Sequence, residues 1–270
     1  GFIRDGEIRF NSKWQWYGEK TKGASEAVQL CKDQGLKVMM KPQIWIHNAY
    51  TGDFKLESDE AWSKFEESYR RFIYEFAGVA EELGVEMLCV GTEWREFVAA
   101  RPEFWKELIA ELKAIYSGQL TYASNWDDFQ DVPFWKELDY VGIDAYFPIC
   151  LSSKAKLKEM CTSWQTHCKL LKSYAAEVDR PILFTEFGYR SLKGTSKNPW
   201  ISDTPGKFDE EEQANGFRSI FQEVWEQDWF AGGFIWKWYN NHDKSGGNKH
   251  LGFTPQNKLA EEVIREFWAN

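Results

Sequence analysis

Two glutamates stand at the ends of apolar runs that have the length and composition of buried strands. Glu93 ends the apolar part of "VEMLCVGTEW" (85–94), and Glu186 ends that of "PILFTEFGYR" (181–190). Cleavage of a glycosidic bond needs two facing carboxyl groups, one protonated and one ionised, and their separation decides between retention and inversion. Two like charges in one site also push the two pKa values apart. For either glutamate alone, the alternative is a solvated loop residue or a helix cap.

The elements that must position these glutamates alternate between strands and helices. Apolar runs at the spacing of strands are followed by longer amphipathic patterns, and glycines such as Gly35 and Gly84 separate them. The expected strands are 36–46, 85–92, 119–126, 139–147, 181–186 and 231–239, and the expected helices are 25–34, 59–83, 102–117, 154–177, 208–228 and 257–270. Six consecutive βα units predict a parallel sheet covered by helices.

Two architectures fit this order, a doubly wound open sheet and a (β/α)8 barrel. The sequence has no GxGxxG motif and no P-loop, which disfavours a nucleotide-binding open sheet. A barrel needs eight strands, and "GEIRFN" (6–11) is too polar to be a confident seventh. If the six strands are numbered 3 to 8, Glu93 and Glu186 end strands 4 and 7. Barrel active sites lie at this end of the strands, so the two side chains are expected to meet there.

Composition narrows the class of protein. The length suits one large domain or two small ones, and the 43% hydrophobic content is ample for a sizeable core. Of the two, we expect a single domain over residues 1–270, which would be the catalytic domain. A net charge of −9 argues against nucleic acid and anionic membranes, no apolar run has the length of a membrane helix, and no signal peptide opens the chain. Five cysteines without a CxxC motif are expected to be mostly free. Fifteen Trp and eleven Tyr suit stacking on sugar rings, or else a Trp-rich core.

Several strand ends together resemble those of glycoside hydrolase family 113, a clan A (β/α)8 family whose known members act on β-1,4-mannan. The matching stretches lie within residues 36–264, most of the chain, and they are "LKVMMKPQIWI", "GTEW", "LTYASNWDDF", "LDYVGIDAYFP", "PILFTEFGYR", "GGFIWKWY" and "GFTPQNKLAEEV". The resemblance implies that Glu93 is the acid/base, that Glu186 is the nucleophile and that the anomeric configuration is retained. It also supports the strand numbers 3 to 8.

The sequence departs from the family in one place and from the wider clan in another. The family's first βα unit and second strand should precede "GFIRD", so strands 1 and 2 are expected to be missing or atypical, and the chain to be truncated at its N-terminus. Many clan A enzymes carry Asn immediately before the acid/base, and this chain has Thr92, which is the pattern of the family itself.

Further residues near the strand ends are candidates for contacts with substrate. Tyr146, beside strand 7, could bond the nucleophile and hold it ionised, or be a Tyr at the rim of the core. Asn125 could bond a sugar hydroxyl or form a turn, and Trp126 could stack on a ring. Trp236 is expected on strand 8, pointing the same way as Trp238 and opposite to Lys237, as the floor of the sugar site.

Strand 3 is expected to end with Trp45 and His47 on one side of the strand. His47 could contact a hydroxyl, although a lone His is more often structural. His242, Asp243 and His250 do not have the spacing of a zinc site, so no metal and no cofactor is expected.

The sequence therefore predicts a retaining glycoside hydrolase that cleaves β-1,4-mannosidic linkages and whose partner is a β-linked oligo- or polysaccharide. Two alternatives remain at this stage. One is a non-catalytic glycan-binding barrel, and the other is a clan A glycosidase that acts on another β-glycan.

Overall fold

The computed structural model describes residues 1–151 and 156–269. The helices are α1 (Thr21–Asp33), α2 (Asp59–Glu82), α3 (Arg95–Ala100), α4 (Pro102–Ile115), α5 (Leu157–Val178), α6 (Glu210–Glu223) and α7 (Leu259–Ala269). The strands are β1 (Phe2–Arg4), β2 (Glu7–Arg9), β3 (Met39–Met40), β4 (Met87–Thr92), β5 (Gln119–Asn125), β6 (Val141–Asp144), β7 (Ile182–Phe187) and β8 (Phe230–Ile235). The first residues of the helix expected at 154–177, and the last residue of the one expected at 257–270, lie outside the described residues.

The strand order of the main sheet decides between the two architectures. Six strands follow one another in the order β3-β4-β5-β6-β7-β8, and the β3–β4, β4–β5 and β7–β8 pairs are parallel. A doubly wound sheet reverses its order at a switch point, whereas a barrel does not. The fold is therefore that of strands 3–8 of a (β/α)8 barrel, as the sequence predicted.

The strands β1 and β2 are not barrel strands. They form a separate antiparallel hairpin in which Ile3 pairs with Ile8, and "GEIRFN" contributes its second strand. The turn between them uses Asp5 and Gly6, both at positive φ. The polar segment that was too weak to count as a barrel strand thus forms a strand of another kind.

The described residues form two compact units. The N-terminal unit comprises residues 1–124 and 128–141, and the C-terminal unit comprises residues 125–127 and those from 142 onward. A single catalytic domain over residues 1–270 stays a prediction.

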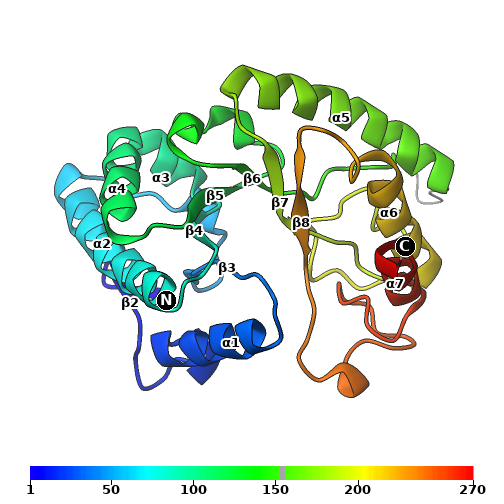
Figure 1. Cartoon of the computed structure of the whole chain (residues 1–270), viewed down its shortest axis with the longest axis horizontal. Coiled ribbons are helices and arrows are strands. Elements are labelled where there is room, and N and C mark those ends of the chain that lie inside the picture. Colours follow the sequence, from blue (N-terminus) through cyan, green and yellow to red (C-terminus); the bar gives the residue numbers. More distant parts are fainter. Residues whose placement is uncertain (152–155, 270) are drawn as a thin grey trace. The chain divides into compact units, whose positions relative to one another are not determined.

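In the N-terminal unit, α2 provides most of the helical core. The Ser58 side chain caps the helix by accepting a hydrogen bond from Ala61 N–H, and acidic residues occupy the first turn, where they complement the helix dipole. Its buried face packs on α4, and the two helices lie side by side in Figure 1. This contact is aromatic, with the Tyr69 ring 5.3 Å from Trp105 of α4 between centroids, and Phe97 of the adjacent α3 lies 5.8 Å from the same ring.

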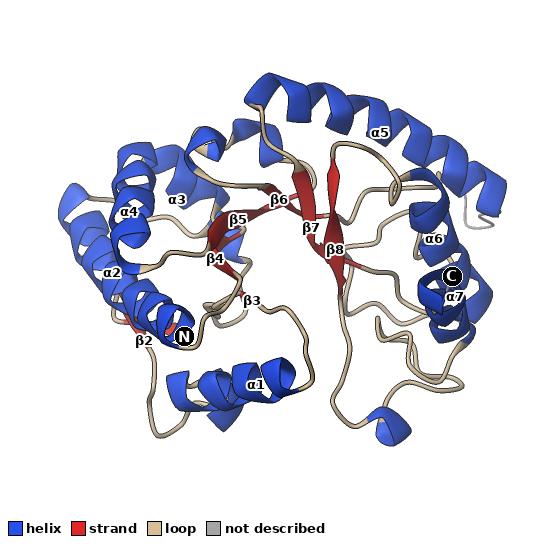
Figure 2. Cartoon of the chain, viewed as in Figure 1, coloured by secondary structure: helices blue, strands red, loops and turns tan. Residues whose placement is uncertain are grey.

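In the C-terminal unit, β7 and β8 pair side by side, and α5, α6 and α7 pack on one another in sequence order (Figure 2). Gly216 of α6 lies against the Tyr189 ring so closely that a Cβ there would stand 2.3 Å from it. This glycine therefore sets how closely α6 approaches the chain that leaves β7.

Three strands are markedly shorter than the sequence predicted, and each correction affects a site residue. The strand expected at 139–147 is reduced to Val141–Asp144, so Tyr146 follows the strand rather than lies on it. The strand expected at 36–46 is reduced to Met39–Met40, because Pro42 has no N–H to donate to a ladder. Beyond it, Trp45 pairs instead with Phe2, and its N–H donates to Gly1 O at 2.9 Å. The strand expected at 231–239 ends at Ile235, so Trp236 and Trp238 follow the strand rather than lie on it.

Candidate active site

Glu186 and Tyr146 are in contact in the C-terminal unit. Glu186 is half-buried near the carboxyl end of β7, and Tyr146 follows β6 and is 7% exposed. The Tyr146 hydroxyl donates to Glu186 Oε2 at 2.8 Å, which is one of the two alternatives that the sequence left open for Tyr146. Backbone pairing holds the two segments together, because Ala145 N–H donates to Glu186 O at 2.7 Å. A phenol that donates to a carboxylate fixes its orientation, and the expectation that Tyr146 also holds Glu186 ionised stays a prediction.

A second side-chain bond links the same two strands. Thr185, the residue before Glu186, donates from Oγ1 to Asp144 Oδ1 at 2.8 Å, and both side chains are buried. Neighbouring positions of β7 therefore each bond the end of β6. Such support from two residues limits how far the Glu186 backbone can move.

Glu93 stands immediately after β4 in the N-terminal unit. Its φ is 53°, in the left-handed region that a glutamate rarely adopts. Its N–H donates to Ala123 O of β5 at 2.7 Å, and the next N–H, that of Trp94, donates to the Tyr122 hydroxyl at 2.7 Å. Surroundings that hold a non-glycine residue in this conformation are most common at functional sites.

The residue after Glu93 anchors this sharp turn. Trp94 is buried, and its ring contacts Phe54 and Phe65, each at 5.6 Å between centroids. The half-buried Glu93 is thus held between a paired strand and a fixed indole. Burial raises the pKa of the Tyr122 phenol well above its ordinary value, and the charges of Asp128 and Glu93 raise it further, so this support stays neutral.

Glu93 and Glu186 belong to different units, each at the carboxyl end of its own strand. The sequence predicted the carboxyl ends of both strands to within one residue. That the two carboxyl groups meet, and at what separation, stays a prediction.

Trp126 forms an aromatic stack that the sequence did not reveal. Its ring lies against that of Trp200, with 5.2 Å between centroids and 25° between planes, and its other neighbour is Phe147 at 5.8 Å. Asn125 ends β5, and its Oδ1 accepts the Trp126 N–H at 2.9 Å, a local contact of the kind expected for a turn residue. The hydroxyl-binding role of Asn125 stays a prediction.

Trp236 lies at the end of β8, and its surroundings differ from those expected. Its N–H donates to Phe187 O at 2.8 Å, and Gly188 approaches the Trp236 carbonyl so closely that a Cβ would stand 2.2 Å from that oxygen. The Lys237 ammonium lies 5.3 Å from the centroid of the Trp236 ring. The prediction that Lys237 faces away from Trp236 is therefore wrong, because the alternation of a strand stops at Ile235.

Trp45 and His47 lie in the N-terminal unit, on the irregular chain after β3. Trp45 is 52% exposed, and the exposed His47 contacts the Asn48 amide at 3.2 Å between nitrogens. The prediction that they end strand 3 is wrong, since β3 stops before Pro42. Their contact with substrate stays a prediction.

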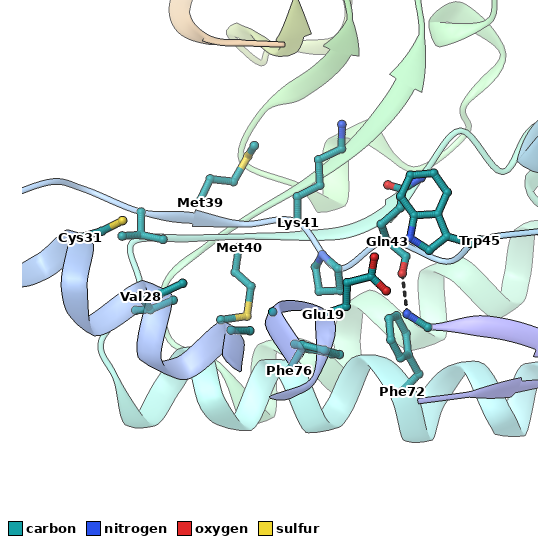
Figure 3. Close-up of a pocket in the computed structure, with 16 residues that line it drawn as sticks. Glu19, Val28, Cys31, Met39, Met40, Lys41, Gln43, Trp45, Phe72 and Phe76 are labelled. Carbon is teal, nitrogen blue, oxygen red and sulfur yellow. Dashed lines mark hydrogen bonds between the residues drawn. The ribbon is translucent and has the colours of Figure 1, made fainter. Parts of the chain in front are cut away.

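Figure 3 shows a pocket of about 360 Å³ in the N-terminal unit, between α1, β3 and α2. Val28, Met40, Phe72 and Phe76 give it a largely apolar wall, and Trp45 lines it too. Glu19 and Lys41 add charged groups to this wall. Across residues 1–151 and 156–269, no group of three or more His, Cys, Asp or Glu is arranged to hold a metal ion. Within the same ranges, no helix is both long and apolar enough to span a bilayer.

The barrel order of the strands and the glutamates at two strand ends are features of barrel glycosidases. The sequence model of "Glycoside Hydrolase Family 113" matches residues 5–258. The chain belongs to glycoside hydrolase family 113 and is a glycosidase. A search of curated protein sequences gave no match.

Solved structures agree with this assignment. One similar structure is that of the GH113 β-mannanase AaManA from Alicyclobacillus acidocaldarius in complex with ManMIm. Its sequence is 26% identical to this chain, the TM-score is 0.81, and the match covers 93% of this chain and 78% of AaManA. A GH113 β-1,4-mannanase complex is 24% identical, with a TM-score of 0.85 and coverage of 100% and 85%. A β-glucuronidase from Faecalibacterium prausnitzii, 18% identical with a TM-score of 0.62 and coverage of 91% and 41%, shares the fold alone.

Proposed function

We propose that the protein is a retaining glycosidase that cleaves β-1,4-mannosidic linkages in mannan or manno-oligosaccharides. The observation that carries this proposal is the bond from the Tyr146 hydroxyl to Glu186 at the end of β7. It supports a carboxylate held in one orientation, which is what a nucleophile requires. The substrate follows from similarity to structures that are named β-mannanases and are 26% identical to this chain.

Retention requires two steps. In the first, Glu93 gives its proton to the glycosidic oxygen while a Glu186 oxygen attacks the anomeric carbon, so the C–O bond to the leaving sugar breaks and a glycosyl ester forms. In the second, Glu93 takes a proton from water, the water oxygen attacks the same carbon, and the ester bond breaks to release Glu186. The two carboxyl groups must then lie about 5 to 5.5 Å apart.

Tyr146 has a separate role in this scheme. Its hydroxyl donates to the Glu186 carboxylate and holds it in one orientation for attack on the anomeric carbon. The left-handed turn at Glu93 supports the complementary requirement, a carboxyl group held in one orientation.

Proton NMR of β-1,4-mannohexaose during hydrolysis tests the proposal. The first reducing ends should be β-anomers, and Glu186→Gln should abolish their formation. Glu96→Gln is the matched control, because Glu96 is a glutamate of α3 only three residues from Glu93. Its carboxylate pairs with the Lys55 ammonium at 3.3 Å. Early α-anomers would contradict retention. Cleavage of cellohexaose in preference to mannohexaose would contradict the substrate, and binding of mannohexaose without turnover would favour a non-catalytic barrel.

Azide distinguishes the roles of the two glutamates. In Glu186→Ala, azide takes the place of the missing carboxylate and attacks the anomeric carbon from the face opposite the leaving sugar. The product should be an α-mannosyl azide. In Glu93→Ala, azide attacks the glycosyl ester, needs no base, and should yield the β-azide from a substrate with a good leaving group. The reverse pattern would exchange the two roles.

A further inference from the structure

The chain between β7 and α6, residues 188–209, is longer than most loops of βα units and carries a large aromatic side chain at Trp200. Trp200 is 42% exposed, whereas the adjacent Pro199 is buried. An exposed indole on a long loop can be incidental. Three features of this loop indicate that it is not.

The first feature is a buried carboxylate that fixes the start of the loop. Glu212 of α6 is 5% exposed. Its Oε2 accepts the Gly194 N–H at 2.7 Å, and its Oε1 accepts the Ser196 N–H at 3.0 Å and the Ser196 hydroxyl at 2.6 Å. The Ser196 carbonyl in turn accepts the N–H groups of Ile149 and Cys150 at 2.9 and 3.2 Å. Charge-assisted bonds of this kind hold an irregular segment in one conformation.

The second feature fixes the far end of the loop. Arg190 is 7% exposed, and its Nη1 donates to the Thr204 carbonyl at 2.9 Å and to the Thr204 hydroxyl at 3.1 Å. Its Nε donates to Leu251 O at 3.2 Å, which joins the loop to the segment after β8. Trp200 therefore stands on chain that is tied down on both sides, at Ser196 and at Thr204.

The third feature is the position of Trp200 in the aromatic stack. Phe147 is buried, Trp126 packs on it at the end of β5, and Trp200 stacks on Trp126 as the outermost of the three rings. Trp126 covers one face of the Trp200 indole, and the side chain still keeps 42% of its surface exposed. The stack begins at the carboxyl ends of the strands, the end where barrel active sites lie.

We propose that the exposed face of Trp200 is a sugar-stacking subsite that binds one pyranose unit of a β-linked glycan, and that it adds affinity for long chains over short ones. This rests on the proposed glycosidase function. The C–H face of a pyranose ring is flat and apolar, and an indole offers a matching surface with a polar edge. Because the loop is already fixed by Glu212 and Arg190, ordering Trp200 on binding costs little entropy.

The test compares a short with a long substrate. The ratio of kcat/KM for mannohexaose to that for mannotriose should fall about tenfold in Trp200→Ala. Trp200→Phe keeps a smaller ring and should give an intermediate ratio. The matched control is Trp268→Ala, since Trp268 of α7 is 53% exposed and also packs on an aromatic neighbour, Phe221. Its ratio should equal that of the wild type.

Binding gives an independent readout. In the Glu186→Gln background, calorimetry should show about tenfold weaker binding of mannohexaose when Trp200 is replaced by alanine. Near-UV circular dichroism checks that each variant is folded, and a misfolded Trp200→Ala leaves Trp200→Phe to decide.

The outcomes separate the two proposals. If the wild type cleaves both oligosaccharides and both Trp200 variants keep its ratio and affinity, the subsite is overturned while the glycosidase proposal stands. Equal losses on both substrates would also overturn the subsite, because they would place Trp200 at the reacting sugar. If the wild type neither cleaves nor binds manno-oligosaccharides, the proposed substrate itself fails.

Discussion

The Tyr146 hydroxyl donates a hydrogen bond of 2.8 Å to Oε2 of Glu186. The phenol is largely buried beside the Phe253 ring, 5.9 Å away between centroids, so its hydroxyl is held on the carboxylate. A hydrogen bond to a charged group contributes about 1.5 to 3 kcal/mol. Replacement of Tyr146 by phenylalanine should therefore lower kcat/KM for mannohexaose by about 10- to 100-fold without unfolding the protein.

The control for this variant is Tyr17→Phe. Tyr17 also donates to a carboxylate, Glu26 Oε1 at 2.6 Å, but on the surface of the N-terminal unit. Steady-state kinetics of both variants shows whether activity depends on the Tyr146–Glu186 bond in particular or falls equally when the Tyr17–Glu26 bond is lost. Equal activity in Tyr146→Phe and Tyr17→Phe would contradict the role given to Tyr146.

The buried carboxylate of Glu212 should be essential for the order of the 188–209 loop. In Glu212→Gln, an NH2 group replaces one oxygen and faces the N–H of Gly194 or Ser196, so a donor meets a donor. This should cost about 2 kcal/mol of the free energy of unfolding and make the loop more sensitive to protease. Urea unfolding and limited proteolysis with mass spectrometry measure the two effects.

A neighbouring glutamate provides the comparison. Glu211 lies on the exposed side of α6 and pairs with Arg218 at 3.1 Å. Glu211→Gln should change stability by less than about 0.5 kcal/mol and leave the cleavage pattern as it is. If the two variants behave alike, Glu212 does not fix the loop.

His167 should make the protein sensitive to acid. Burial lowers the pKa of this imidazole, and the bond between its Nε2 and Pro148 O, 2.9 Å long, only partly opposes the shift. The unfolded chain titrates at the ordinary value of about 6.5. Below that pH the unfolded state binds a proton that the folded state does not, so the free energy of unfolding falls as pH falls toward the folded pKa.

Replacing His167 by glutamine should therefore flatten the loss of stability as pH falls below about 6.5. Urea unfolding across this range measures it, with His47→Gln as the control because His47 is exposed. The same slope in His167→Gln and in the wild type would show that other groups cause the acid sensitivity. The His167 ring lies 4.9 Å from that of Phe147, between centroids, and Phe147 is the innermost ring of the Trp126 stack. Protonation of His167 would therefore place a positive charge beside this stack.

The sequence predicted the elements whose patterns are long or sharply ended. The helix expected at 59–83 is α2 to within one residue, because its apolar spacing is sustained and Gly84 stops it. Glu93 and Glu186 could be placed near strand ends because a charge interrupts an apolar run. Tyr146 could be placed near Glu186 because its segment was expected to be the neighbouring strand, although that strand proved to end at Asp144.

Features that depend on long-range contacts escaped the sequence. Trp45 pairs with Phe2, so the chain after Pro42 leaves the sheet, and no local pattern shows this. Trp126 and Trp200 are far apart in the chain and meet only through the folded loop. Glu212 reads as one of several acidic residues at the start of a helix, and only its burial against Gly194 and Ser196 distinguishes it.

The packing of α6 on the chain after β7 yields the last prediction. A Cβ at Gly216 would stand 2.3 Å from the Tyr189 ring, which is itself buried and cannot give way without disturbing Phe217, 6.0 Å from it between centroids. Gly216→Ala should therefore destabilise the protein by about 2 kcal/mol or more, despite the higher helix propensity of alanine.

Gly78 is the matched helical glycine in α2. It is exposed, and nothing lies within 4 Å of a Cβ placed there. Gly78→Ala should stabilise the protein by about 0.5 to 1 kcal/mol, since only the propensity term remains. If urea unfolding shows that the two substitutions change the free energy of unfolding in opposite directions, then contact with Tyr189, rather than backbone freedom, requires glycine at 216. A stabilising Gly216→Ala would mean that Tyr189 can move, and the segment from β7 to the Trp200 loop would then be less firmly held than its hydrogen bonds indicate.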